Sequence, residues 1–289
     1  MQARFLPWLD RSGRLSPLKL AVFAALFAPA VWIAVQYDLG WLKADAVKSV
    51  IHESGVWALR ILLVSLAVSP LRRIGGWNKL IAVRRMLGVA VLFYVLGHFA
   101  LYIVQQRGDL VHVASEIALR FYLTVGFVAL LGLSALGATS TDAMIRRIGP
   151  ARWNRLHALA YPIGILALLH DMLQSKLDVS GPLLLAGLFL WLMGWRVLQR
   201  AKRGESLPAL VALAVAVPAV TALFEAAWYH ARNGVAVADV FAADLSFDDG
   251  LRPVWLVLIA GLAVVALRVA RPLWSRRPRA ARPVRAAAE

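Results

Sequence analysis

Eight runs of apolar residues, each long enough to cross a bilayer, constrain this chain more than any other feature of its sequence. The chain has 289 residues, of which 61% are hydrophobic, and its mean hydropathy is +0.68. A helix of about 20 apolar residues spans a membrane and satisfies its own backbone hydrogen bonds there. We therefore predict an all-α, polytopic membrane helix bundle with spans at residues 20–37, 54–70, 86–104, 119–138, 156–174, 182–199, 208–228 and 253–270.

Lys and Arg gather on one side of this eight-span arrangement. Of the 32 residues of these two types, 24 lie in segments that alternate spans place on the same side, namely 1–19, 70–86, 139–156, 196–207 and 268–289. Cytoplasmic loops carry such an excess of positive charge, so both termini are expected in the cytoplasm. The net charge of +16 thus has a topological explanation and does not predict nucleic-acid binding. The Arg-rich and Pro-rich tail, 271–289, is expected to contact anionic lipid headgroups.

Several kinds of chemistry are excluded by what the sequence lacks. It contains no cysteine, which excludes covalent CxxCH haem attachment, iron–sulfur clusters and thiolate catalysis. It also has no glycine-rich loop of the type that binds a dinucleotide or a nucleoside triphosphate. The longest outer loop, 230–252, is too short for a catalytic domain. If the chain handles electrons, both the donor and the acceptor must come to it.

Three histidines, His98, His157 and His170, lie within the predicted spans. An ionisable residue inside a membrane indicates a functional site, and neutral imidazole is a common axial ligand of haem iron. His98 and His170 are expected at the same depth, toward the outer face, where they could hold one haem b. His157 lies thirteen residues before His170, or roughly 20 Å along a helix, at the depth of a second haem. On an ideal helix those two rings would point about 140° apart, so tilt or distortion would have to bring them into one bundle interior.

Arginines near the histidines allow two interpretations. Arg60, well inside a predicted span, could pair with a haem propionate or extend its side chain to the interface. Arg85 and Arg155, with Arg84 and Arg152, could hold haem propionates or the phosphate of FMN, or could only set the topology. Gly126 and Gly132 favour close helix packing over contact with a cofactor.

A set of short motifs in order along residues 45–200 resembles the MsrQ (YedZ) family of ferric-reductase-like membrane proteins. The motifs are GVWALR (55–60), LAVSPLRR (66–73), RRMLG (84–88), YLTVG (122–126), ATST (138–141), IRRIG (145–149) and WNRLH (153–157). The resemblance implies haem b and FMN, an inner-membrane location, and electrons drawn from quinol. It implies that these electrons pass to a periplasmic molybdopterin reductase, MsrP, which reduces methionine sulfoxide in proteins.

The sequence departs from the wider ferric-reductase pattern in two respects. Related ferric reductases and NADPH oxidases carry two histidines on each of two helices, but Arg85 stands thirteen residues before His98. The fourth ligand therefore stays open, with His52 as a candidate and His112 expected beyond the end of the helix. The family core has about six spans, so we expect a cytoplasmic segment at 1–19, a haem-binding core at 20–200, two additional helices within 201–270 and a basic tail at 271–289.

These features predict a b-type cytochrome that transfers electrons from quinol to a periplasmic partner and is not itself the catalytic subunit. Two other functions stay open. One is a quinol-linked ferric or other metal-ion reductase with the same haems and no protein partner. The other is a non-redox transport subunit whose histidines move protons. A visible haem absorption band in the purified protein would exclude the second.

Overall fold

The computed structural model describes residues 6–275 except 11, 43–44, 176–177 and 249, and the described residues form helices without a strand. Eight helical segments are long and apolar enough to cross a membrane, which confirms the predicted polytopic helix bundle. They are Pro17–Asp38, Ala46–Gly75, Asn78–Gln105, Phe121–Ala138, Pro150–Gln174, Ser180–Arg200, Leu207–Asn233 and Pro253–Trp274.

Three of these segments are each built from two consecutive helical pieces. In chain order the elements are α1 (Pro17–Ala25), α2 (Ala28–Asp38), α3 (Ala46–Gly75), the 3-10 helix η2 (Asn78–Val83), α4 (Arg84–Gln105), α5 (Leu110–Leu119), α6 (Phe121–Ala138), α7 (Asp142–Ile148), α8 (Pro150–His157), α9 (Ala160–Gln174), α10 (Ser180–Arg200), α11 (Leu207–Asn233), α12 (Val237–Leu245) and α13 (Pro253–Ser275). The short helices α5 and α12 lie in connections between spans, and α12 lies within the expected outer loop 230–252.

Local sequence explains where several helices begin and end. The side chains of Asp45, Asp109 and Thr141 accept hydrogen bonds from backbone N–H groups in the first turns of α3, α5 and α7. Gly76 and Gly234 end α3 and α11 in the left-handed conformation, which glycine adopts without a steric penalty. These caps satisfy the polar groups that helix ends leave unpaired.

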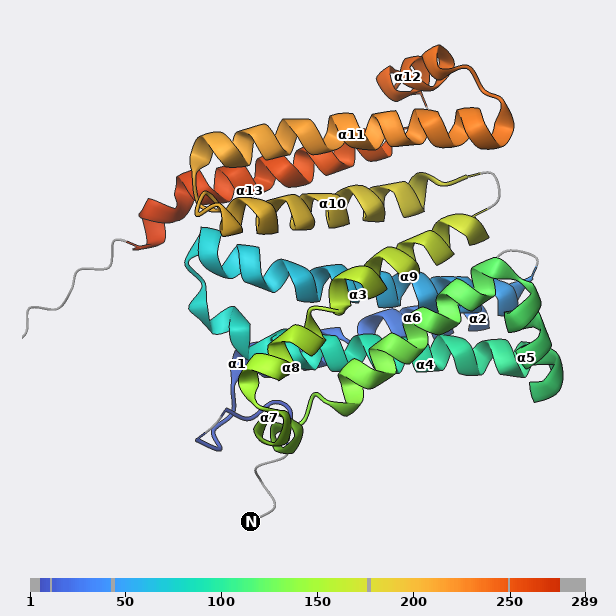
Figure 1. Ribbon diagram of the computed structural model, residues 1–289, viewed down its shortest axis with the longest axis horizontal. Helices are drawn as coiled ribbons and strands as arrows, with labels where there is room; N and C mark the ends of the chain where they lie inside the picture. Colours follow the sequence, from blue (N-terminus) through green and yellow to red (C-terminus); the bar gives the residue numbers. More distant parts are fainter. Residues whose placement is uncertain (1–5, 11, 43–44, 176–177, 249, 276–289) are drawn as a thin grey trace, which may run out of the picture.

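The long helices form two groups that share α3 and α10 as their boundary (Figure 1). In the first group α3 packs on α4, α6 packs on α9, and the two pairs contact each other. The second group contains α10, α11 and α13. One continuous core runs through both groups and includes Leu66, Leu87 and Leu133 from the first and Phe189 and Trp191 from α10.

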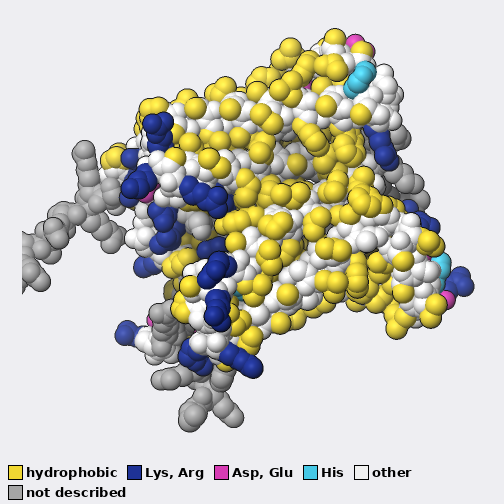
Figure 2. All heavy atoms as spheres, viewed as in Figure 1, with side chains coloured by type: hydrophobic (Ala, Val, Ile, Leu, Met, Phe, Trp, Pro, Cys, Tyr) yellow, Lys and Arg dark blue, Asp and Glu magenta, His cyan; other side chains and the backbone are white. Residues whose placement is uncertain are grey.

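The two ends of the bundle differ in charge. Lys and Arg side chains gather at the end where α1, α7 and α8 lie, and apolar side chains cover the middle of the visible face (Figure 2). We call this the arginine-rich end, defined by the Lys and Arg residues of 70–86, 139–156 and 196–207. The opposite end carries α5 and α12. An apolar band between two polar ends is the surface that a membrane-spanning bundle requires.

The additional helices expected within 201–270 are α11 and α13; both pack against α10 and against each other, and α13 also contacts α3. α13 continues to Ser275, so the boundary expected at residue 270 moves five residues toward the C-terminus. The Arg271 side chain donates hydrogen bonds to Glu205 Oε2 (2.7 Å) and to the backbone carbonyl of Arg73 (3.2 Å). The rest of the expected basic tail, 276–289, lies outside the described residues.

Candidate functional site

His98 and His170 meet between the two helix pairs of the first group. His98 projects from α4 and His170 from α9, and their ring centroids are 6.3 Å apart with the planes at 85°. Both side chains are half-buried, and both residues lie within helices that are apolar enough to span a membrane. The two residues expected at one depth therefore face each other directly.

Each ring is held by the same backbone arrangement on the neighbouring helix. Nδ1 of His98 lies 2.7 Å from the carbonyl oxygen of Ile51 on α3, and Nδ1 of His170 lies 2.8 Å from that of Tyr122 on α6. Since a carbonyl only accepts, each Nδ1 carries the proton and donates it. This leaves both Nε2 lone pairs available as ligands, and fixing the ring through its other nitrogen is what metal-binding histidines usually show.

A glycine one turn after each carbonyl makes room for the ring. Gly55 follows Ile51 by four residues, and Gly126 follows Tyr122 by four. A Cβ at Gly55 would lie 3.1 Å from the His98 ring, and one at Gly126 would lie 2.7 Å from Nδ1 of His170. These two glycines contact the histidines, whereas Gly132 faces Ile163. Both Gly126 and Gly132 let α6 pack closely on α9, Gly126 against the ring of His170 and Gly132 against Ile163.

The two rings offer one imidazole nitrogen each to a shared cofactor. The Nδ1 hydrogen bonds orient both rings and leave both Nε2 lone pairs available, and the ring centroids are 6.3 Å apart. Neutral imidazole is a common ligand of haem iron, so this donor set fits haem.

His157 lies at the arginine-rich end, apart from the other five histidines. It ends α8, stacks on Trp153 at a centroid distance of 3.8 Å, and its Nε2 is 3.2 Å from the hydroxyl of Thr139. Thr139 follows the last residue of α6, and Tyr122 is the second residue of that helix, so the two contacts are separated by roughly 25 Å. The structure brings no second histidine to His157.

A break in the fifth span turns His157 and His170 toward the same helix. α8 ends at His157 and α9 begins at Ala160, with Ala158 and Leu159 forming the turn. The break changes the direction of the helix between the two histidines, which are thirteen residues apart. As a result both rings contact α6, one at each end.

The three arginines proposed as cofactor partners lie in different surroundings. Arg60 is exposed on α3, and its guanidinium lies 4.7 Å from the ring centre of Trp57. Arg85 forms an ion pair with Asp142 at 2.6 Å at the arginine-rich end. Arg155 is exposed on α8, two residues before His157. Arg60 is thus nine residues beyond Ile51 along α3, and the other two arginines are near His157.

The remaining histidines do not complete a second pair. His52 is exposed near the start of α3, and His112 is exposed on α5, after α4 has ended at Gln105. His230 lies at the end of α11, where its Nδ1 is 3.0 Å from the carbonyl of Val235. Among the residues that the structure describes, no cluster of three or more His, Cys, Asp or Glu side chains has the arrangement of a metal site. The pair His98 and His170 is therefore the strongest candidate for binding a cofactor.

This fold and site define a class: a multi-pass membrane protein with paired histidines in a helix bundle. The family model described as a ferric reductase like transmembrane component matches residues 54–168, which include His98 and His157, and His170 lies two residues beyond the matched range. No solved structure matches the chain.

Two curated relatives carry the name protein-methionine-sulfoxide reductase heme-binding subunit MsrQ. The one from Xanthomonas campestris pv. campestris (strain B100) is 43% identical over 189 residues, which cover 63% of this chain and 86% of that protein. The one from Rhodospirillum rubrum is 40% identical over 198 residues, which cover 68% of this chain and 93% of that protein. The chain belongs to the MsrQ family.

Proposed function

We propose that this chain is the haem-binding, electron-transferring subunit of a methionine-sulfoxide reductase system. The observation that carries the proposal is the His98–His170 pair, with its 6.3 Å centroid separation and its two Nδ1 atoms bound to backbone carbonyls. Its MsrQ relatives are named heme-binding subunits, which agrees with this proposal.

His98 and His170 would hold haem b through their Nε2 atoms, and the haem would supply reversible one-electron chemistry. α3 and α6 orient the two rings, and the apolar helices around them exclude water. Arg60 on α3 is the candidate partner for a propionate. His157, with Arg85 and Arg155 near it, stays a candidate for a second haem whose other ligand is not a histidine of this chain.

The donor and acceptor complete the proposal. Electrons would enter from quinol and leave toward a periplasmic MsrP-like molybdopterin reductase that acts on methionine sulfoxide. The placement of the histidine pair supports this direction, because it lies nearer the end that carries α5 and α12 than the arginine-rich end. The arginine-rich end would face the cytoplasm and the protein would lie in the inner membrane.

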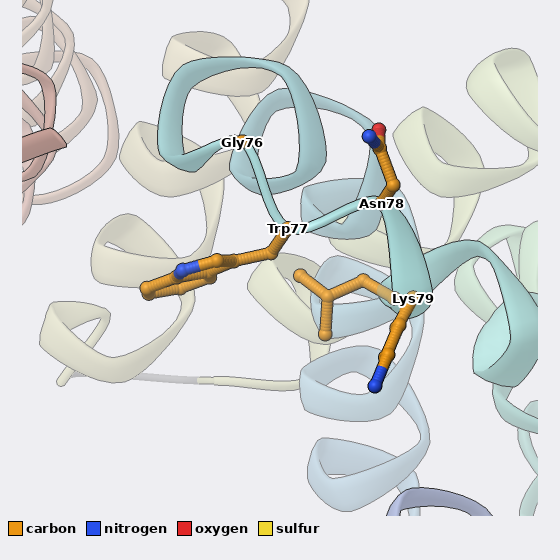
Figure 3. A pocket seen from close by; sticks show the side chains of 5 residues that line it. Gly76, Trp77, Asn78 and Lys79 are labelled. Carbon is orange, nitrogen blue, oxygen red and sulfur yellow. The ribbon is translucent and has the colours of Figure 1, made fainter. Parts of the chain in front are cut away.

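FMN is a second proposed cofactor, and a hollow at the arginine-rich end offers it a place. The hollow has a volume of about 480 Å³ and is lined by Gly76–Leu80. The Trp77 ring and the Lys79 amine project from this turn in different directions (Figure 3). An indole face can stack on a flavin, and an amine can pair with its phosphate.

The haem assignment is tested by absorption spectra of purified single variants. His98→Ala and His170→Ala should each remove the same haem component, since either change deletes one of two ligands on one iron. His112→Ala is the matched control because this histidine is exposed on α5, and it should keep the full wild-type spectrum. Full haem content in both ligand variants would refute the assignment.

The route of the electrons is tested by reducing and reoxidising the purified haem protein. A quinol analogue should reduce it, and NADPH alone should not, because the sequence has no nicotinamide-binding loop. An MsrP-like partner with methionine sulfoxide should then reoxidise it. The match to a ferric reductase like component favours a second candidate, a metal-ion reductase. Fast reoxidation by ferric chelates, with none by the partner, would support that candidate instead.

A further inference from the structure

Three arginines from three helices converge at the arginine-rich end. Arg72 is near the end of α3, Arg84 begins α4, and Arg196 is on α10. Arg84 is close enough to the other two for their charges to act on it. The guanidinium of Arg196 lies 4.8 Å from the ring centre of Tyr161 on α9, so four helices meet around this cluster.

No carboxylate balances the cluster. Elsewhere at this end Arg85 pairs with Asp142 at 2.6 Å, and Arg271 pairs with Glu205 at 2.7 Å. Within the described part of the chain, neither Arg72, Arg84 nor Arg196 forms an ion pair with an acid. Nε of Arg72 is buried and has no hydrogen-bond acceptor. A buried donor without a partner costs free energy, so its persistence indicates a missing acceptor.

One member of the cluster, Arg196, is held in place by contacts that setting the membrane topology does not require. Arg196 donates one hydrogen bond to the carbonyl of Leu192 on its own helix (2.8 Å) and another to that of Leu66 on α3 (3.0 Å). A charge that only sets membrane topology can extend into water. Arg196 is instead held against two other helices, while Arg84 stays exposed and can be reached from outside.

We propose that Arg72, Arg84 and Arg196 form a binding site for a phosphate group at the level of the lipid headgroups. Guanidinium groups bind phosphate oxygens with paired, charge-assisted hydrogen bonds. Basic pockets between transmembrane helices on the cytoplasmic side bind anionic lipid headgroups in this way. The phosphate would belong to an anionic phospholipid, and the soluble phosphate ligand FMN is the other source to be tested. The site does not depend on the haem assignment.

The experiment measures thermal unfolding of the purified full-length protein in one detergent while a short-chain lipid is added. Phosphatidylglycerol should raise the midpoint in a saturable way, and phosphatidylcholine, whose headgroup has no net charge, should raise it much less. Arg84→Gln and Arg196→Gln should each weaken the phosphatidylglycerol effect about tenfold, the usual scale for losing a hydrogen bond to a charged group. Arg84→Lys keeps the positive charge and should recover part of the affinity.

The control is the double variant Arg146→Gln/Arg147→Gln, which removes two exposed arginines of α7 and should bind the lipid as the wild type does. The same variants are titrated with FMN and followed by flavin fluorescence. Binding of FMN that depends on the cluster, without a lipid response, would assign the phosphate to the soluble ligand. Equal lipid responses in wild type and Arg84→Gln would overturn the site. Loss of haem in the cluster variants with an unchanged lipid response would also overturn it, because a haem carboxylate would then occupy the site.

Discussion

At the scale of single residues, two glycines control whether the histidine pair can form. Each ring lies against the neighbouring helix at a glycine, which has no side chain, and it reaches the carbonyl four residues earlier. The first side-chain atom of any other residue would occupy part of this space. Gly55 and Gly126 are thus as necessary to the geometry as the imidazoles.

Gly126→Ala should lower the haem content of the purified protein without unfolding it. The new methyl group would lie 2.7 Å from Nδ1 of His170, so the ring must move away from the Tyr122 carbonyl. Gly132→Ala, on the same helix, meets only the flexible end of Ile163 and should keep its haem. The measurement is the haem-to-protein ratio from absorption spectra. Similar ratios in the two variants would show that the glycine at 126 has no special role.

Part of this site could be predicted from the sequence, and the rest could not. Counting residues from the ends of the spans places His98 and His170 at one depth, because a helix rises by a constant amount per residue. The carbonyls of Ile51 and Tyr122 carry no signal in the sequence, since every residue has one. Gly55 was visible within a family motif, but its role depends on which helix packs beside it.

At the scale of helices, α11, α12 and α13 are joined by an ionic network at the end opposite the arginines. Glu225 on α11 is fully buried and accepts a hydrogen bond from Arg252 (2.9 Å), which lies just before α13. Nε of Arg252 is 3.5 Å from Asp244 on α12, and burial raises the pKa of Asp244. Hydropathy could predict the two extra spans but not this network, whose partners are separated by 27 residues.

Arg252→Met should destabilise the protein by about 3–5 kcal/mol, because it leaves the carboxylate of Glu225 buried without its partner. The double variant Glu225→Leu/Arg252→Met should recover much of this loss, since it removes both buried charges. The measurement is the thermal unfolding midpoint in detergent. The haem spectrum should stay unchanged in both variants, because the network lies in a different helix group from His98 and His170. Loss of haem in the folded double variant would mean that these helices support the site.

At the scale of the whole molecule, the charge difference between the two ends predicts how the protein lies in the membrane. Gly204 is in the turn between α10 and α11 at the arginine-rich end, and Asp244 is on α12 at the other. Reporter fusions at these two positions should therefore show opposite sides, with the fusion at Gly204 in the cytoplasm. Signals from the same side at both positions would contradict the eight-span topology.

The eight spans could be predicted because mean hydropathy depends only on the residues within one window of the sequence and not on which helices pack together. The ends of the helices were less predictable. α3 runs over 30 residues, from Ala46 to Gly75, where the apolar run covers only 54–70. The polar first turns of α3 are stabilised by the Asp45 cap and carry Ile51, which is the residue that anchors His98.

The backbone anchors of the two histidines have a consequence for genetics. Because the acceptors are main-chain carbonyls, no substitution at position 51 or 122 can delete them while the helix persists. A saturation scan of the gene should therefore find positions 51 and 122 tolerant of many side chains, and positions 55 and 126 restricted to glycine. The arrangement that orients the two histidines would thus be recognised in the coding sequence only by the requirement for glycine at positions 55 and 126.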